Sequence, residues 1–214
     1  SYETAFSKMG DAIFNTFYLA GISIVLIILF AILIAYITVR RKNAITNLLD
    51  ILTMFPYIVP GSILGIALLL SFNKKPLLLS GTALIMIISF VIRRLPYTIR
   101  SSAAILHQVN ISVEEAAISL GASNIKTFFK IVLPMMISGV ISGAILSWVT
   151  IISELSTSII LYTGNTRTMT IATYTEVIRG NYGVAAALAT ILTVVTVISL
   201  LIFFKLTGEK EITM

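Results

Sequence analysis

Uncharged apolar runs divide the chain into five segments that approach or reach membrane-spanning length. The runs cover residues 12–39, 51–73, 76–92, 131–153 and 181–204. A helix needs about 20 apolar residues to cross a hydrocarbon core of roughly 30 Å. The third run is the shortest, but Lys75 and Arg93 at its ends can extend their charged groups toward the membrane surface. The pattern therefore predicts an all-α integral membrane protein with five transmembrane helices.

These helices are expected to form a single transmembrane domain over residues 1–214. The expected helices cover about residues 14–39, 51–73, 76–95, 133–154 and 182–206. The two longest connections are expected at about residues 100–132 and 155–181, on opposite sides of the membrane.

Composition agrees with a membrane protein and excludes several other classes. Hydrophobic residues make up 57% of the chain and charged residues 11%, whereas a soluble domain has about 45–50% and 25%. The absence of cysteine excludes disulfides and thiolate metal sites. One histidine, His107, offers little for a metal site, so we expect no metal and no cofactor.

The distribution of lysine and arginine predicts the orientation of the chain, because such residues are enriched in cytoplasmic loops. The larger group falls on one side: Arg40, Arg41, Lys42, Arg93, Arg94, Arg100, Lys126, Lys130, Lys205 and Lys210. The smaller group falls on the other: Lys8, Lys74, Lys75, Arg167 and Arg179. We therefore expect the C-terminus and the 100–132 loop in the cytoplasm and the N-terminus outside. An outside N-terminus further predicts a transmembrane segment before Ser1. The positive charge is distributed among the loops, and no nucleic-acid partner is expected.

The 100–132 loop is expected to hold two short helices joined by a glycine. Ser112 and Glu115 have the spacing of a capping box at the start of the first helix. Gly121 is placed to end that helix in a left-handed conformation, and Ser123 can begin the second. Such a projecting unit exposes apolar side chains and therefore needs a partner surface.

The same loop carries a recognisable signature. Glu115-Ala116-Ala117, Gly121, Ile131 and Leu133-Pro134 resemble, at every signature position, the EAA loop of binding-protein-dependent ABC importer permeases. Residues 15–16, 56–61 and 95–97 are also similar to this family. The resemblance implies the five-helix core of type I permeases, as in the maltose and methionine permeases. It also implies that the EAA segment is a coupling helix that docks in a groove of a cytoplasmic ATPase.

The resemblance implies a function as well as a fold. It predicts a multi-pass permease subunit of the bacterial inner (cytoplasmic) membrane, which is not itself an enzyme. The implied partners are a cytoplasmic ABC ATPase dimer, a second permease half or copy, an external substrate-binding protein and the lipid bilayer. Residues 153–157 and 163–170 look like the ferric-iron subgroup, in which one polypeptide often holds two similar halves; this chain resembles the second half. Related subgroups carry phosphonate, thiamine, sulfate or polyamine.

Several polar or helix-breaking residues are candidates for a translocation path. Pro56 and Pro60 break the expected helix 51–73, either as a packing kink or as a hinge that lines the path. Glu154, at the outer end of helix 133–154, is either solvated or faces the path. Ser153, Ser156 and Thr157 either line a polar vestibule or bond to their own helix backbone.

Two other function classes fit less well. A secondary transporter usually has ionisable residues deep in the membrane and internal repeats, whereas all five runs are uncharged. An intramembrane enzyme would need an HExxH motif or a buried acid–histidine pair, and His107 falls in the expected loop. The chain also has no GxxxxGK[ST] motif, so an importer would take its energy from a partner ATPase.

Overall fold

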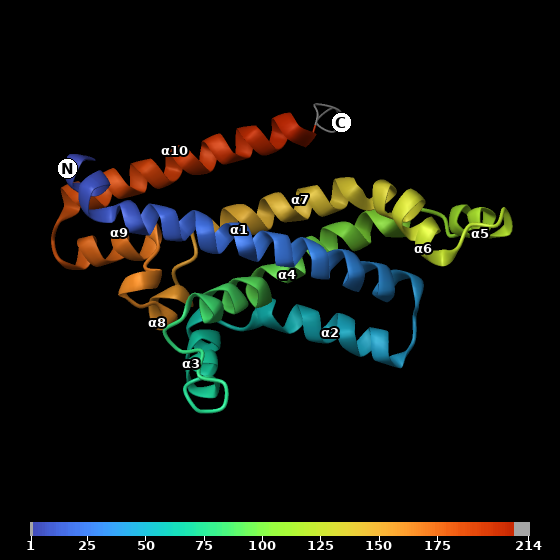
Figure 1. Ribbon diagram of the computed structural model, residues 1–214, viewed down its shortest axis with the longest axis horizontal. Helices are drawn as coiled ribbons and strands as arrows, with labels where there is room; N and C mark the ends of the chain where they lie inside the picture. Colours follow the sequence, from blue (N-terminus) through green and yellow to red (C-terminus); the bar gives the residue numbers. More distant parts are fainter. Residues whose placement is uncertain (1, 208–214) are drawn as a thin grey trace.

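The computed structural model describes residues 2–207, and every regular element in that part of the chain is a helix (Figure 1). The all-α class predicted from the apolar runs is thereby confirmed for those residues. The long helices are α1 (Tyr2–Arg40), α2 (Ala44–Ile58), α3 (Gly61–Ser71), α4 (Ala83–Gln108), α7 (Leu133–Ile152), α9 (Met169–Ile178) and α10 (Tyr182–Thr207). The short ones are α5 (Ser112–Ser119), α6 (Asn124–Thr127), the π-helical turn Phe128–Val132, α8 (Ser158–Leu161) and the 3₁₀ turn Gly164–Thr166.

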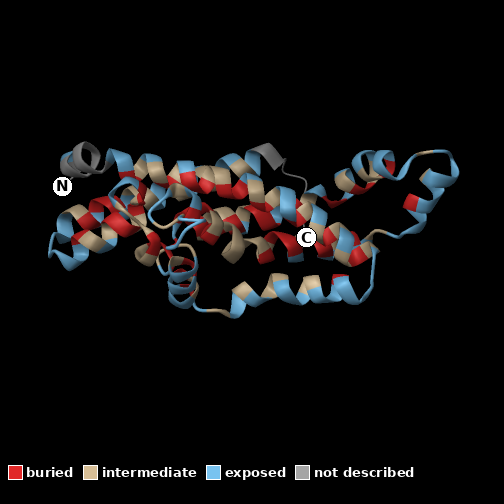
Figure 2. Ribbon diagram, turned by 60° about the horizontal axis from the view of Figure 1, so that its bottom comes forward, coloured by how far each residue is buried: buried red, intermediate tan, exposed pale blue. Residues whose placement is uncertain are grey.

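Helices α1, α4 and α7 form the centre of the molecule. They pack against one another along their lengths, and α2 lies against α4 on the outside of this group (Figure 1). Leu19 and Ile27 of α1 meet Ile85 and Met86 of α4 and Ile152 of α7 in the main core. Buried residues are concentrated in these three helices, whereas α2 is mostly exposed (Figure 2). The exposed side chains of α2 include Ile45, Ile51, Phe55 and Ile58, which suits contact with lipid or protein rather than water.

Two glycines of α7 allow it to approach α4 closely. A Cβ atom at Gly139 would lie 2.6 Å from the carbonyl oxygen of Ser101. A Cβ atom at Gly143 would lie 2.5 Å from the Cα atom of Thr98. Small residues at four-residue spacing let helix backbones come together in membrane proteins. The 139/143 pair therefore serves packing within the chain.

Three helical segments of the described chain have the length and apolar composition to cross a membrane. They are Gly10–Arg40, Asn124–Ile152 and Tyr182–Lys205, and α2 with α3 makes a fourth if the bent pair counts as one span. Helix α4 is long enough but carries Arg93, Arg94 and Arg100. Five membrane spans therefore stay a prediction.

Three of the expected helices differ from those observed. The helix expected at 14–39 begins instead at Tyr2. The helix expected at 76–95 begins instead at Ala83 and continues to Gln108, so the long connection starts at Val109 rather than at residue 100. The helix expected at 51–73 is two helices that meet at 109°. Pro56 stays inside α2, and the break falls at Pro60, which lacks an N–H and stands immediately before α3.

The lengthening of α4 changes the charge distribution that predicted the orientation. Arg93, Arg94 and Arg100 were assigned to a cytoplasmic loop, but all three lie within α4. Lys210 and the side chain of Lys8 lie outside the described residues. The predicted orientation therefore rests mainly on Arg40, Arg41, Lys42 and the lysines of residues 126–130.

Candidate functional site

A helix–glycine–helix unit projects beyond one end of the bundle (Figure 1). We call residues 111–127, which comprise α5, Gly121 and α6, the knob. Gly121 has φ of +92°, the left-handed backbone expected from the sequence. Its N–H donates to the Ile118 carbonyl (2.9 Å), and the Ala122 N–H donates to the Ala117 carbonyl (3.0 Å). This pair of bonds closes the end of α5 and turns the chain toward α6.

The cap expected at the start of α5 is wrong. The second helix was expected to begin at Ser123, and that residue caps α6, which begins at Asn124. Ser112 is already helical, so its hydroxyl is not at the capping position, and the expected pairing with Glu115 is not made. The side chain of Asn110 instead accepts a hydrogen bond from the Ser112 N–H (3.0 Å). At α6, the Ser123 hydroxyl accepts from the Lys126 N–H (3.3 Å).

A buried ion pair fastens the knob to the end of α1. The Nε atom of Arg40 lies 2.5 Å from Oε1 of Glu114, a residue only 6% exposed. Arg40 also donates through Nη2 to the Val109 carbonyl (2.9 Å), and the Tyr36 hydroxyl donates to Oε2 of Glu114 (3.3 Å). Glu114 could not be identified from the sequence because two adjacent glutamates begin α5, and only the fold decides which of them turns inward.

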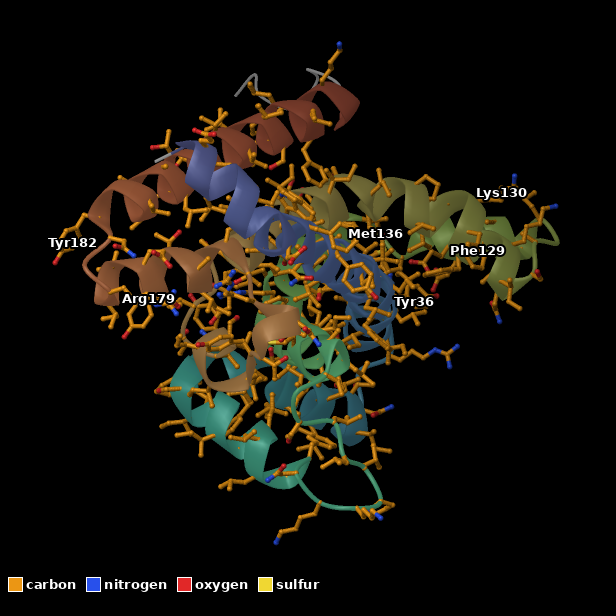
Figure 3. The ribbon with its side chains drawn as sticks, turned by 60° about the vertical axis from the view of Figure 1, so that its left-hand side comes forward. Tyr36, Phe129, Lys130, Met136, Arg179 and Tyr182 are labelled. Atoms are coloured by element: carbon orange, nitrogen blue, oxygen red, sulfur yellow. The ribbon has the colours of Figure 1, made fainter. Side chains whose placement is uncertain are left out.

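The residues of the EAA-like signature lie in or next to the knob and are largely accessible. Glu115, Ala116 and Gly121 are exposed, Ala117, Ile131 and Leu133 are half-buried, and Pro134 is exposed in the first turn of α7. Large apolar side chains accompany them: Leu120 is 89% exposed and Ile125 is 73% exposed. Phe129 and Lys130 lie at this end of the bundle, and Arg179 and Tyr182 lie at the opposite end (Figure 3).

Replacing Arg40 by glutamine is expected to loosen the knob. Glu114 would lose its charged partner, and hydrogen bonds to charged groups contribute roughly 1.5–3 kcal/mol each. Limited proteolysis should then cut residues 109–123 faster than in the wild-type chain, with the bundle left folded. The double variant R40Q/E114Q should recover part of the loss, because it leaves no buried charge unpaired. Equal cleavage of R40Q and wild type would show that the pair does not hold the knob.

A second polar group lies where α7 ends. After Ile152 the chain turns back and buries Glu154, which is 3% exposed. Its carboxylate pairs with Nη2 of Arg94 and lies 3.5 Å from Nε of Arg93. It also accepts from the Ser156 hydroxyl (2.8 Å) and the Thr157 N–H (2.9 Å). We call these five residues the Glu154 cluster. The interpretation of Glu154 as a solvated residue is therefore wrong.

This cluster explains why α4 tolerates arginines. Arg93 lies roughly 15 Å along α4 from its start, at 1.5 Å per residue. A charged group at such a position is stable when a partner neutralises it. Glu154 supplies that partner for Arg93 and Arg94, and Asp50 of α2 supplies it for Arg100 (3.1 Å).

The other candidate path residues divide between the cluster and simple backbone contacts. The Ser153 hydroxyl donates to the Val149 carbonyl of its own helix (2.9 Å). Bonding to its own helix backbone was one of the two roles expected for this residue, the other being to line a polar vestibule. The Thr157 hydroxyl donates to the Gly61 carbonyl (3.2 Å), so it joins the cluster to the start of α3. The break at Pro60 leaves that start beside Arg93. Their closeness is shown at Gly61, where an added Cβ atom would overlap the side chains of Arg93 and Ser156.

A cavity of about 510 Å³ adjoins the cluster. Its lining comprises Ser62, Arg94, Ser153, Glu154, Leu155, Ser156, Ile159 and Tyr174. The structure therefore gathers Ser153, Glu154 and Ser156 at one cavity, whereas the buried Thr157 and the two prolines, Pro56 and Pro60, do not line it.

Comparison with known proteins relates nearly the whole chain to one family. Residues 6–207 match the family model described as "Binding-protein-dependent transport system inner membrane component". The ferric transport system permease protein FbpB of Actinobacillus pleuropneumoniae is 38% identical over 94% of this chain. The chain spans only 29% of the length of that relative. The molybdate/tungstate transport system permease protein WtpB of Pyrococcus furiosus is 32% identical over 92% of this chain and 76% of its own length.

A solved structure shares the arrangement of the helices. It is the crystal structure of a bacterial ABC transporter involved in the import of the acidic polysaccharide alginate. The match has a TM-score of 0.74 and covers 95% of this chain and 79% of the other, at 17% sequence identity. At that identity the likeness concerns the fold alone.

Proposed function

The chain belongs to the family of binding-protein-dependent transport system inner membrane components, the permeases of ABC importers, and from this premise we propose that it translocates ferric iron delivered by an external binding protein. The chain forms one half of the translocation unit, and a second half or copy completes it. Energy comes from a dimer of cytoplasmic ABC ATPase subunits. The family premise also places it in the inner membrane.

The observation that supports ATP-driven coupling is the knob. It combines a carboxylate, Glu115, with the highly exposed apolar side chains of Leu120 and Ile125 at one end of the bundle. Exposed apolar side chains gathered on a projecting unit mark a protein-binding surface. We propose that α5 docks in a groove of the ATPase and that the Arg40–Glu114 pair transmits its movement to α1. The adjoining signature residues Ala116, Ala117, Gly121, Ile131, Leu133 and Pro134 hold or shape this contact.

The translocation path is proposed to pass the cavity beside the Glu154 cluster. Ionisable residues inside a membrane protein commonly mark substrate routes. Ser153, Glu154 and Ser156 line this cavity, and the Thr157 N–H donates to the Glu154 carboxylate. Pro60 shapes the wall, because the break there turns α3 so that it begins at the cluster, whereas Pro56 stays inside α2.

Ferric iron is the favoured substrate because the ferric permease relative is 38% identical over 94% of the chain. Molybdate or tungstate is the second candidate, since the molybdate/tungstate permease relative WtpB is 32% identical over 92% of the chain. The test is uptake of radioactive iron and of radioactive tungstate by vesicles that hold the natural polypeptide with its ATPase and binding protein. ATP-dependent uptake of iron alone supports the proposal; uptake of tungstate alone replaces it with the second candidate. Uptake driven by an ion gradient without ATP would favour a secondary transporter.

Cysteine labelling is expected to place the knob in the cytoplasm. The chain has no cysteine of its own, so a single introduced cysteine reports one position. A membrane-impermeant maleimide added to intact cells should label cysteines at Lys74 and Arg167. Cysteines at Lys42 and Lys126, at the knob end, should react only after the membrane is opened. The reverse pattern would invert the orientation and remove the proposed contact with a cytoplasmic ATPase.

A further inference from the structure

The Glu154 cluster holds more positive than negative charge. Arg93 and Arg94 both pair with the one carboxylate of Glu154. The other acidic residues that form ion pairs in the described part of the chain have cations of their own. These pairs are Asp50 with Arg100, Glu114 with Arg40, and Glu176 with Arg179. Among residues 2–207, no second carboxylate therefore lies within ion-pair distance of the two cluster arginines.

The excess charge is accompanied by hydrogen-bond donors that lack acceptors. Nε and Nη1 of Arg93 and Nε of Arg94 are buried and have no hydrogen-bond partner. Buried charged donors without acceptors are costly. The start of α3 adds to the positive potential, because a helix N-terminus carries a partial positive charge. That start packs directly against Arg93, since a Cβ at Gly61 would overlap its guanidinium.

Glu154 itself has little capacity left to hold a cation. Its oxygens already accept from Arg94, from the Ser156 hydroxyl and from the Thr157 N–H. The adjoining cavity of about 510 Å³ is lined by Arg94 and by the hydroxyl-bearing residues Ser62 and Tyr174. Ser156 also lines it, but its hydroxyl already donates to Glu154. Guanidinium and hydroxyl donors are the groups that proteins use to recognise carboxylate, phosphate and similar oxyanions.

We propose that this cavity is an oxyanion site: an anion held there by Arg94 and the hydroxyls of Ser62 and Tyr174 balances the second positive charge, and Arg93 strengthens its binding through the local potential. The anion is either free or a ligand of a metal ion that is being carried. A bare metal cation would be repelled by the same charges. The inference rests on the proposed function only in placing the site on a transport route; binding itself needs no ATPase.

The experiment measures anion binding by isothermal titration of the natural polypeptide in lipid nanodiscs. The probes are sulfate alone and the ferric citrate complex, each against chloride at matched ionic strength. R93Q removes the excess charge and leaves the Arg94–Glu154 pair, so binding should weaken roughly tenfold, the factor that about 1.4 kcal/mol represents. R93K keeps the charge and should retain most of the binding. R179Q removes an exposed arginine that pairs with Glu176 elsewhere, and should bind like wild type.

The variant E154Q is expected to strengthen sulfate binding, opposite to the effect of R93Q. It therefore distinguishes an anion site from a site in which Glu154 binds a cation. An amide keeps the shape of the side chain but removes the negative charge that competes with the anion, so sulfate should bind several-fold more tightly. If Glu154 were a cation ligand, E154Q would leave sulfate binding unchanged. The proposal is overturned if neither probe binds, or if R93Q binds like wild type. Binding of ferric citrate alone identifies the anion as one that arrives on the metal, whereas sulfate binding shows that a free oxyanion suffices.

These outcomes are independent of the test of the permease function. A chain that associates with its ATPase and drives uptake, but binds neither probe through Arg93, would lack the oxyanion site and keep the proposed function. A chain that binds sulfate through Arg93 but neither associates with an ATPase nor supports uptake would have the oxyanion site and lack the proposed function. R93Q, R93K and R179Q should elute as monodisperse protein, and they carry the test if E154Q does not fold.

Discussion

Replacing Gly121 by aspartate is expected to abolish substrate uptake while the chain still accumulates in the membrane. Gly121 has φ of +92°, and a residue with a Cβ pays about 1 kcal/mol or more there. Apart from its immediate chain neighbours, no residue has a heavy atom within 4 Å of the position that a Cβ would occupy, so the change causes no clash in the bundle. The strain is relieved by turning α6 relative to α5, which displaces the surface proposed to contact the ATPase.

The measurements are co-purification of the ATPase and ATP-dependent uptake. A displaced knob that loses about 1.4 kcal/mol of contact lowers the affinity for the ATPase tenfold. E115K should act in the same direction, because it reverses the charge in the first turn of α5, where a carboxylate is favoured by the helix dipole. Normal ATPase association and full uptake by both variants would make the knob an ordinary connector and remove the main support for coupling.

Gly180 provides a closely matched control. It has φ of +78° and nothing within 4 Å of its Cβ position, and it ends α9 through the same pair of backbone bonds. Gly180 follows α9, next to Arg179, at the opposite end of the bundle from the knob (Figure 3). G180D therefore introduces the same local strain without touching the knob, and it should leave ATPase association unchanged. Loss of association in G180D as well would point to general destabilisation.

Replacing Glu154 by alanine is expected to be the most destabilising single change in the cluster. It would leave two guanidinium groups, 16% and 12% exposed, without their shared carboxylate. Removal of one partner from a buried ion pair typically costs about 3–5 kcal/mol. The Ser156 hydroxyl and the Thr157 N–H would also lose their acceptor. The expected results are a marked fall in the thermal unfolding midpoint in nanodiscs and reduced accumulation in the membrane.

The matched control is D50A. Asp50 also pairs with an arginine of α4, but the two side chains of the Asp50–Arg100 pair are 34% and 52% exposed. Exposed pairs contribute about 0–1 kcal/mol, so D50A should unfold close to the wild-type temperature. Equal midpoints for E154A and D50A would mean that the cluster is solvated in the membrane-embedded protein. That result would also weaken the argument for an uncompensated charge.

The apolar runs predicted the helical class and most of the long helices because burial in lipid imposes a simple rule on sequence. A segment that must satisfy its own backbone in an apolar medium becomes a long uncharged helix. The rule located α1, α7 and α10 to within a few residues at most ends, although α1 extends beyond the expected start. It failed to predict the full length of α4, because the arginines in this helix are neutralised by carboxylates from segments distant in sequence. Hydropathy along the chain carries no information about such pairs. It also failed between α2 and α3, where the number of prolines was clear but the position and size of the bend were not.

In the knob, one feature could be predicted from the sequence and another was decided by the tertiary structure. A glycine just after a short helix is required by left-handed backbone geometry, so Gly121 could be predicted from its position alone. The first of the two adjacent glutamates, Glu114, is the one fastened to Arg40, and the second, Glu115, faces outward. That choice depends on where α1 ends relative to α5, which is set by long-range packing.

The sequence by itself determined that this chain is a helical membrane protein and which family it resembles, because both follow from residue types at short, regular spacings. Only the tertiary structure decided which charges meet. Glu154 and Arg94 are separated by 60 positions, and they pair because α4 and α7 pack side by side with glycines at their contact. The free energy of a buried charge depends on its neighbours in space rather than in sequence. For that reason the positive excess of the Glu154 cluster became visible only in the folded chain.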